Sequence, residues 1–434
     1  MIDPGQYRDR FPILETCTYL INHSLAAMPA AAEDNLREYA RTWRERGIRA
    51  WAGSDAGEAG AARPETAGRV PRPAWAEGWW EMPVTVGDQL GRILGAPAGS
   101  IVMHQNVTVA EAIVLSCFQP TAGRNRVVYE DANFPSVRYL YQAQPSLEVA
   151  AVEDAAAIVE AIDERTLLVP ISHVLFKNGE IQDVGPIVRR AHEAGAYVVL
   201  DCYQSAGVVP FDLTELDVDF AVGGSVKWLC GGPGAGWLYV RPDVAERLEP
   251  TLVGWQAHVR PFAFEPELEY AAGSRRFLTG TPNVPALYAA TAGYDVIEEV
   301  GVPRIRERSL ELTQLLIDLC DESGLEIVSP REPERRGGTV TVSTPDHAAC
   351  HRELGERGIV CDFRPDSGLQ ASAAKPPRRG GEDPGAPGAG GAGGVRLGPH
   401  FYNTDDEVRH AVTELADIVG SRAYERHLGA AAPF

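Results

Sequence analysis

The feature that most constrains the fold is a series of short apolar runs, rich in β-branched residues, in the middle of the chain. The four runs read "RVVYE" (126–130), "TLLVPIS" (166–172), "AYVVLD" (196–201) and "VDFAVGG" (218–224). Amphipathic helical patterns such as "VGPIVRRAHEAGA" (184–196) separate some of them. Strands that are apolar on both faces and alternate with helices indicate an α/β fold with a mostly parallel sheet.

After residue 300 the pattern changes. A long amphipathic helix is expected over 302–324, a strand over 337–343, a helix over 347–358 and a last helix that opens on a Thr cap at 404. This order predicts a smaller α+β domain. We therefore expect an N-terminal arm (1–50) that contributes to the small domain, an insert (51–75), a large domain (76–298) and a small C-terminal domain (299–434).

Two stretches contain too few large apolar residues to form a packed core. Residues 52–73 and 372–394 are rich in Gly, Ala and Pro. We expect the insert at 51–75 and a loop at 367–394 to be mobile or irregular, either as solvated surface loops or as lids over a site.

Composition narrows the classes of partner. The formal net charge of −20 would repel phosphate backbones, which argues against nucleic acid and favours a small molecule. Seven cysteines without a CxxC pair predict neither a disulfide framework nor a zinc site, so no metal is expected. The sequence has no run of about 18 apolar residues and no signal-peptide pattern at its start, so we expect a cytoplasmic protein without a membrane span.

Two charged residues follow neighbouring strand patterns. Asp201 ends "YVVLD", and Lys227 follows "DFAVGG", so both are expected at the carboxyl ends of strands, where open α/β sheets bind ligands. Pyridoxal phosphate requires a lysine that forms a Schiff base and a carboxylate that keeps its ring nitrogen protonated. Taken alone, Lys227 could equally be a solvated loop lysine and Asp201 a helix cap.

A phosphate site is the next requirement. Asn106, Val107 and Thr108 open an apolar helix, and the free N–H groups of a helix start suit an anion. The same pattern also fits an ordinary helix start. The glycine-rich stretch 231–236 follows Lys227 instead of preceding it, which disfavours a nucleotide-binding P-loop.

With these parts in place, the chain resembles the fold type I pyridoxal-phosphate enzymes of the class V aminotransferase superfamily, most closely the kynureninase branch. The resemblance runs over nearly the whole chain. Its ordered motifs are "YLINHSLAAMP", "NVTVAEAIVL", "EDANFPSVRYL", "DCYQSAGVVPFDL", "VDFAVGGSVKWLCGGPGAGWLYV", "PTLVGWQAH", "RRFLTGTPNVPAL", "RRGGTVTV", "RGIVCDFRPDSG" and "VRLGPHFYNT". The resemblance implies a fold type I transferase architecture, with a mostly parallel sheet of the seven-stranded type, a cofactor-binding large domain and a homodimer with shared active sites.

The resemblance also implies roles for the matching positions. Lys227 would form the Schiff base and Asp201 would contact the pyridinium nitrogen. The other cofactor-binding positions would be Val107, Thr108, Phe134, Gln204, Ser205, Trp255 and Thr281. Arg396 would hold the substrate α-carboxylate by a two-point ion pair. The segment from Asn22 through Ser24 to Leu25 would line the substrate entrance.

Departures from the family pattern leave the reaction open. Gln204, Val226 and Val137 stand where kynureninases carry a histidine, a tyrosine and an aspartate, and Val226 cannot transfer a proton. His104 and His173 could be substrate-facing acids or bases, or structural histidines. We expect an enzyme that acts on an amino acid through an external aldimine and a Cα carbanion, with kynureninase-like Cβ–Cγ hydrolysis or Cβ elimination in specialised metabolism. The alternatives are a class V aminotransferase that makes an oxo acid and a non-catalytic cofactor-binding homologue.

Overall fold

A computed structural model describes residues 2–53, 74–366 and 393–429 of the 434-residue chain. The predicted insert at 51–75 and the predicted loop at 367–394 lie mostly outside the described residues. The described chain forms two compact units: unit 1 comprises residues 1–27, 120–210 and 301–434, and unit 2 comprises residues 28–119 and 211–300. The bounds of these units differ from those of the predicted large and small domains. The division into a large and a small domain stays a prediction.

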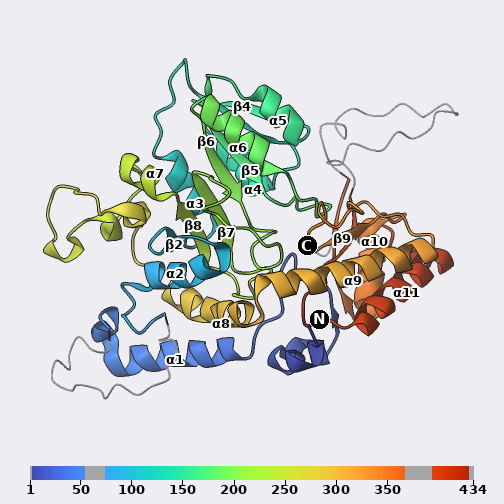
Figure 1. The fold of residues 1–434 in the computed structure, drawn as a ribbon. Coiled ribbons are helices and arrows are strands. Elements are labelled where there is room, and N and C mark those ends of the chain that lie inside the picture. The colour runs from blue at the N-terminus through green and yellow to red at the C-terminus, as the bar shows by residue number, and fades with distance from the viewer. Residues whose placement is uncertain (1, 54–73, 367–392, 430–434) are drawn as a thin grey trace. The chain divides into compact units, whose positions relative to one another are not determined.

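The main sheet has seven strands in the order β2-β8-β7-β6-β5-β3-β4 (Figure 1). Its strands are β2 (Ile101–His104), β3 (Arg126–Glu130), β4 (Glu148–Val152), β5 (Thr166–Ser172), β6 (Tyr197–Asp201), β7 (Phe220–Gly224) and β8 (Gly236–Val240). In unit 1, β4, β3, β5 and β6 pair in parallel. In unit 2, β8 pairs antiparallel with both β2 and β7. The expected mostly parallel sheet is confirmed, with one reversed strand.

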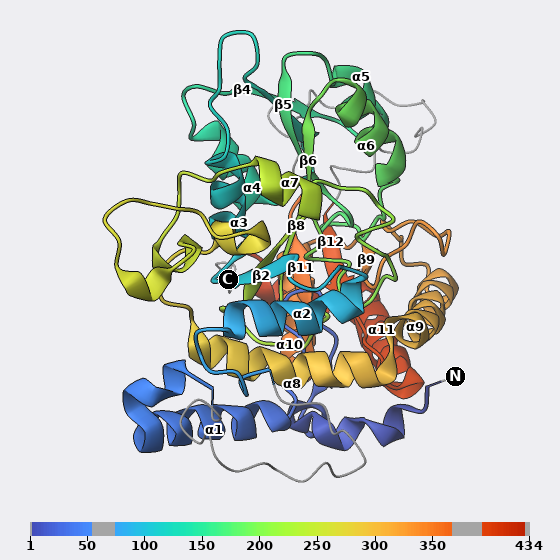
Figure 2. The same ribbon diagram turned by 60° about the vertical axis from the view of Figure 1, so that its left-hand side comes forward.

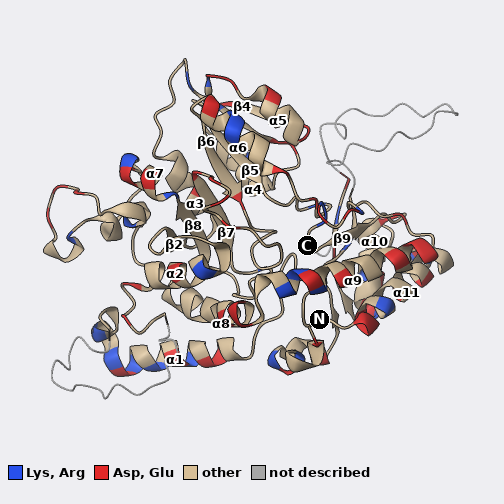
Figure 3. Ribbon diagram, in the orientation of Figure 1, with Lys and Arg blue, Asp and Glu red and all other residues tan. Residues whose placement is uncertain are grey.

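Unit 2 stacks helices on one another. Its helices are α1 (Ala31–Arg46), α2 (Met82–Leu94), α3 (Val107–Leu115), α7 (Pro242–Arg247) and α8 (Val284–Val300). Helices α1, α8 and α2 lie side by side in both ribbon views, and α2 contacts β2 (Figure 2). Exposed α1 carries acidic residues in its first turn and arginines in its last, an order that suits the helix dipole (Figure 3).

Besides its part of the main sheet, unit 1 contains a second, smaller sheet that packs against three helices. The helices and the remaining strands of the whole unit are as follows. Its helices are α4 (Pro135–Gln142), α5 (Ala155–Ala161), α6 (Val184–Glu193), α9 (Val302–Glu322), α10 (His347–Glu356) and α11 (Asp405–Ser421). Its remaining strands are β1 (Thr18–Tyr19), β9 (Val340–Val342), β10 (Ile359–Val360), β11 (Asp362–Arg364) and β12 (Gly394–Leu397). The order β11-β12-β9 is antiparallel, and α9, α10 and α11 bury their apolar faces with it in one core.

The predicted elements after residue 300 are confirmed, and the local reason is visible at their ends. The Thr404 side chain accepts a hydrogen bond from Glu407 N, and Glu407 reaches back to Thr404 N, which makes a capping box. At the start of α10, the Asp346 side chain accepts a hydrogen bond from Ala349 N. No helix among the described residues is long and apolar enough to span a membrane.

Candidate functional site

The turn that carries Lys227 is held by its own hydrogen bonds in unit 2. Ser225 Oγ donates to Ala235 O at 2.6 Å and is 2.6 Å from Tyr294 Oη. Two backbone N–H groups close the turn, Cys230 N to Lys227 O and Gly231 N to Ser225 O. The turn therefore fixes the backbone of Lys227, whose side chain is half-buried.

Helix α8 packs directly against this turn. A Cβ atom on Gly293 would lie 2.2 Å from Leu229 O, so only glycine lets α8 approach this closely. Gly232 and Gly234, further along the same loop, have φ values of 71° and 90°, which L side chains rarely adopt. The glycines after Lys227 therefore let the backbone turn sharply beside it.

The start of α3, also in unit 2, has the properties of an anion site. Asn106 caps the helix by accepting from Val109 N at 3.0 Å, and the first turn carries no acidic residue. Val107 is buried, whereas Thr108 is exposed. A Cβ on Gly236 would lie 2.7 Å from Asn106 Cα, so glycine in β8 permits the close approach to the cap. Free N–H groups, an exposed hydroxyl and no competing carboxylate fit a phosphate group.

His104, at the end of β2, faces a small cavity. Within the described residues its Nε2 atom is buried without a hydrogen-bond partner, as is Oε1 of Gln256. Both side chains line the cavity, together with Thr279 and Asn283. Burial lowers the pKa of His104 to about 4, so the imidazole is neutral near pH 7.

Trp255 and Thr281 lie on the surface of unit 2. Both are exposed. The Trp255 indole donates to Pro261 O at 2.5 Å, and its ring stacks on Phe264 with centroids 5.6 Å apart. Their predicted approach to the cofactor phosphate stays a prediction.

Three strand ends of unit 1 form a row of polar groups. Asp201 pairs in register with Ser172 on the neighbouring strand β5. Ser172 N in turn donates to Oε1 of Glu130, the last residue of β3, at 2.9 Å. Asp201 is 9% exposed, and its Oδ1 accepts from Tyr203 N at 2.8 Å. The predicted position of Asp201 at a strand's carboxyl end is confirmed.

Two further predicted residues of unit 1 contact each other. His173 Nδ1 and Ser205 Oγ are 3.0 Å apart, and both residues are buried. Burial lowers the pKa of His173 to about 4, so this histidine is also neutral near pH 7. Gln204, next to Ser205, donates from its amide to His23 O at 3.0 Å.

Phe134 is placed where a ring could stack on a ligand. It is the N-cap residue of α4 and is 38% exposed. An edge contact with Phe176 helps to position it: the two rings are T-shaped, with centroids 5.2 Å apart. An aromatic face that is held on one side and exposed on another suits the predicted stacking role.

Arg396 is buried and paired. Its Nη2 atom is 2.5 Å from Oδ2 of Asp362, and its Nη1 donates to Phe176 O. Its Nε has no partner within the described residues. Burial lowers the pKa of Arg396 to about 10, a value at which the guanidinium is still charged near pH 7.

Asn22 connects the N-terminal segment to the C-terminal part of unit 1. Its amide donates to Gly398 O at 2.8 Å, and its Oδ1 accepts from Tyr402 Oη at 2.5 Å. Asn22 is fully buried, whereas Ser24 is half-buried. The predicted role of both residues at a substrate entrance stays a prediction.

The sequence reasoning missed Glu130 and Asp362. A signal was present for Glu130, because "RVVYE" ends in a carboxylate just as "YVVLD" does. Asp362 stands beside Arg364 in "CDFR", but only the antiparallel register of β11 and β12 brings it opposite Arg396.

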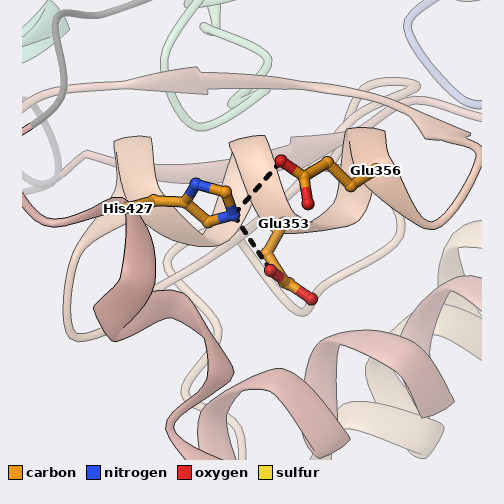
Figure 4. A group of neighbouring side chains, drawn as sticks. All are labelled: Glu353, Glu356 and His427. Carbon is orange, nitrogen blue, oxygen red and sulfur yellow. Dashed lines mark hydrogen bonds and ion pairs between the residues drawn. The ribbon is translucent and has the colours of Figure 1, made fainter.

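One cluster of side chains has the composition of a metal site. Glu353, Glu356 and His427 offer ligand atoms within 4.8 Å of one another (Figure 4). Arg426 donates to both carboxylates at 2.6 Å, and Arg357 pairs with Glu353 at 3.0 Å. Because the arginines already neutralise these carboxylates, the cluster is an ion-pair network that joins the C-terminal segment to α10.

Comparisons with known proteins identify the family of the chain. The family model "Aminotransferase class-V" matches residues 86–410. A kynureninase from Pseudomonas fluorescens is 31% identical over 82% of this chain and 84% of its own length. The "Uncharacterized aminotransferase YcbU" of Bacillus subtilis is 27% identical over 95% of this chain and 97% of its own.

Solved structures show the same fold. The apo cysteine desulfurase from Thermococcus onnurineus NA1 superimposes with a TM-score of 0.76 at 21% identity, over 97% of this chain and 99% of that one. A cystine C-S lyase called C-DES superimposes with a TM-score of 0.75 at 20% identity, over 94% of this chain and 99% of its own. These structures show the fold; the family match and the kynureninase relative show that the chain belongs to the aminotransferase class-V family of pyridoxal-phosphate-dependent enzymes.

Proposed function

We propose that the protein cleaves a bond at the side chain of an amino-acid substrate, either by hydrolysing Cβ–Cγ or by eliminating a group from Cβ. The observation that carries the proposal is the 31% identity to a kynureninase over 82% of this chain. It is supported by three of the expected residues: the turn-held Lys227, the buried strand-end carboxylate Asp201 and the buried Arg396.

The residues present fit pyridoxal phosphate. The phosphate would bind to the N–H groups at Val107 and Thr108, and Phe134 would stack on the ring. The remaining phosphate and ring contacts would come from Gln204, Ser205, Trp255 and Thr281. Lys227 would bind the aldehyde carbon, and Asp201 would hold the proton on the ring nitrogen. When bound, the cofactor supplies an electron sink for charge that develops at the substrate Cα.

The protein's own groups would then bind the substrate and move its protons. Arg396 would bind the substrate carboxylate through the face that Asp362 does not occupy. Lys227, a base once it is released from the aldehyde, would take the Cα proton and return it later. His104 is neutral near pH 7 and has an unpartnered Nε2, so it is the better candidate for a second proton acceptor than His173, whose Nδ1 already contacts Ser205.

Transamination is the second candidate. Val226, which stands where kynureninases carry a tyrosine, cannot donate a proton to a leaving carbonyl group. The similarity to YcbU, named as an uncharacterized aminotransferase, covers more of the chain than the kynureninase match does. A non-catalytic homologue has less support, because a scaffold needs neither the lysine nor the carboxylate-binding arginine.

We do not propose a cysteine nucleophile. A reactive cysteine has to be an accessible thiolate. Cys361, the cysteine nearest the "DFR" motif, is 2% exposed, and burial raises the pKa of its thiol well above the usual range. Five of the seven cysteines are buried and the other two are half-buried.

We propose that the protein forms a homodimer with shared active sites, because unit 2 has an exposed apolar segment. This segment carries the exposed side chains Leu252, Trp255, Val259, Phe262, Phe264 and Leu268. Exposed apolar clusters of this kind mark association surfaces. Replacing Phe264 by Asp should shift the mass measured by light scattering from dimer toward monomer, whereas a monomeric wild type would contradict the proposal.

The test of the cofactor assignment uses the small number of lysines. The sequence contains three, Lys177, Lys227 and Lys375. We expect borohydride reduction of the loaded protein, followed by peptide mapping, to label Lys227 alone. The Lys227→Ala variant should lose the visible absorption band, whereas Lys177→Ala and Lys375→Arg should keep it. Label on another lysine would overturn the assignment.

The test of the reaction uses product analysis. The loaded protein is incubated with kynurenine, 3-hydroxykynurenine, cysteine derivatives, aspartate and alanine in turn. Alanine or pyruvate formed from a substrate with a larger side chain supports bond cleavage. An oxo acid with the intact side chain, formed together with pyridoxamine phosphate, supports transamination instead. No product from any of these amino acids would count against both candidates.

A further inference from the structure

A buried carboxyl group, Glu130, lies beside the pyridinium-binding position assigned above, and none of the proposed functions uses it. It ends β3 and is 1% exposed. Its Oε1 accepts from Ser172 N at 2.9 Å, and within the described residues its Oε2 is buried without a partner. One strand further along the sheet, Ser172 is in register with Asp201. The row thus places two buried carboxyl groups on either side of a single strand end.

Two buried carboxyl groups on strands that flank the same strand do not ionise independently, because the protein interior screens their charges poorly. Each negative charge raises the free energy of placing the other, so the pair holds its protons more tightly than either group would alone. Burial, opposed by the hydrogen bonds from Ser172 and reinforced by the charge of Asp201, raises the pKa of Glu130 to about 7. Glu130 therefore changes its charge in the neutral pH range.

A cation near Glu130 is Arg138 on α4, which interacts with Tyr129 and whose Nη1 atom donates to Asp131 O at 3.2 Å instead of to the Glu130 carboxyl group. The strand β5 continues into His173, which burial keeps neutral near pH 7. On its own strand, Tyr129 precedes it and is neutral there too, because burial raises the pKa of its phenol. Further charged groups near these elements are Asp131, which follows Glu130 in the chain, Glu148 on β4, in register with Arg126 at the far end of β3, and Glu160, exposed on α5.

We propose that Glu130 is a positioning residue that sets the proton affinity of Asp201, and through it the strength with which the site holds the proton on the cofactor's ring nitrogen. This inference rests on the proposed role of Asp201. With Glu130 protonated, the pair carries the single negative charge of Asp201. When Glu130 ionises, the second negative charge would make Asp201, and with it a ring nitrogen bound there, hold a proton more tightly.

The first experiment needs no cofactor. A carboxyl whose pKa is raised in the folded state stabilises the protein fully below its unfolded pKa, about 4.5, and loses that contribution as pH rises through about 7. Urea unfolding of the apoprotein is compared at pH 5 and pH 8 for wild type, Glu130→Gln, Glu130→Asp and the control Glu193→Gln. Glu193 is an exposed residue at the end of α6.

At pH 5 we expect wild type to unfold at a higher urea midpoint than Glu130→Gln. At pH 8 this difference in urea midpoint should be smaller or reversed. Glu193→Gln should follow wild type at both values. A constant difference between wild type and Glu130→Gln would show that Glu130 does not titrate in this range and would overturn the inference.

The second experiment measures the coupling itself in the loaded protein. The visible absorption spectrum is titrated with pH, and the midpoint of the cofactor's spectral transition is compared between variants. We expect Glu130→Gln to shift this midpoint by on the order of one pH unit, a tenfold change in a proton-binding constant. Glu130→Asp should restore part of the shift, because it keeps an ionisable group, whereas a purely structural role would not be rescued in this way.

The two experiments separate two kinds of failure. If the apoprotein shows the expected pH dependence and the loaded protein shows no shift, Glu130 titrates but does not act on the ring nitrogen, and the inference is wrong while the proposed function stands. If no variant, wild type included, binds pyridoxal phosphate, the proposed function fails and the inference fails with it.

Discussion

The guanidinium of Arg396 and the carboxylate of Asp362 lie 2.5 Å apart in the interior of unit 1, where Arg396 is 1% exposed. The pair forms across the antiparallel strands β12 and β11. Arg364 also donates to Asp362, and His23 lies 3.8 Å from it, so the carboxylate is surrounded by donors. A substrate carboxylate would therefore meet an arginine whose orientation is already set.

Removing the carboxylate of Asp362 should lower the stability of the protein more than removing a carboxylate from an exposed ion pair. The Asp362→Asn variant leaves the Arg396 charge buried without a carboxylate, which we expect to lower the free energy of unfolding by about 3 kcal/mol. Glu356→Gln removes an exposed ion pair with Arg426 and should cost less than about 1 kcal/mol. Urea unfolding measures both, and equal losses would contradict a special role for the buried pair.

The cap of α3 can be tested against a matched cap elsewhere. Asn106 accepts from Val109 N at 3.0 Å, and Asp154 accepts from Ala157 N at 2.9 Å at the start of α5. Each Ala substitution should lower stability by about 1 kcal/mol. Only Asn106→Ala should also weaken pyridoxal phosphate binding, measured by equilibrium dialysis. If Asp154→Ala weakens binding as much, the start of α3 is not the phosphate site.

Helix α8 should tolerate no side chain at Gly293. The Cβ of an alanine would lie 2.2 Å from Leu229 O, so Gly293→Ala should push the Lys227 turn away and cost about 2 kcal/mol or more. A Cβ on Gly420 in α11 would meet no atom within 4 Å, and Gly420→Ala should stabilise the protein by about 0.5 kcal/mol. Thermal unfolding separates the two outcomes, and a neutral Gly293→Ala would show that the turn yields.

His104 should make the protein sensitive to acid. Its pKa is about 4 when folded and about 6.5 when unfolded, so below pH 6.5 the unfolded state takes up a proton that the folded state does not. Stability should therefore fall as pH drops from 7 to 5, by about 2 kcal/mol from this residue. The His104→Gln variant should lose that part of the dependence, whereas His410→Gln, at an exposed position of α11, should keep it.

Glu130 changes the stability with pH in the direction opposite to His104, so the two contributions have to be measured separately. Its contribution decreases as pH rises toward 7, whereas that of His104 increases over much of the same range. His173, whose pKa burial also lowers to about 4, adds a contribution of the same sign as His104, so the wild-type profile alone does not identify any single residue. The differences between wild type and each single variant isolate the two contributions, provided that the residues act independently.

The local elements of the fold were predictable from the sequence. The runs at 126–130 and 166–172 became β3 and β5, and Thr404 became the cap of α11. These features depend on a few adjacent residues: a run of β-branched side chains favours a strand, and a hydroxyl three residues before a glutamate closes a capping box. The position of Asp201 at a strand end followed from the same local pattern.

The sequence by itself determined the strands, the caps, the family motifs and the residues that could hold the cofactor. Only the tertiary structure decided which of these residues act on one another. Glu130 and Asp201 are 71 positions apart in the chain and become neighbours of the same strand because β3 and β6 flank β5. Asp362 faces Arg396 because of a strand register. Register and strand order are set by the burial of whole faces over long sequence distances, which no local pattern encodes.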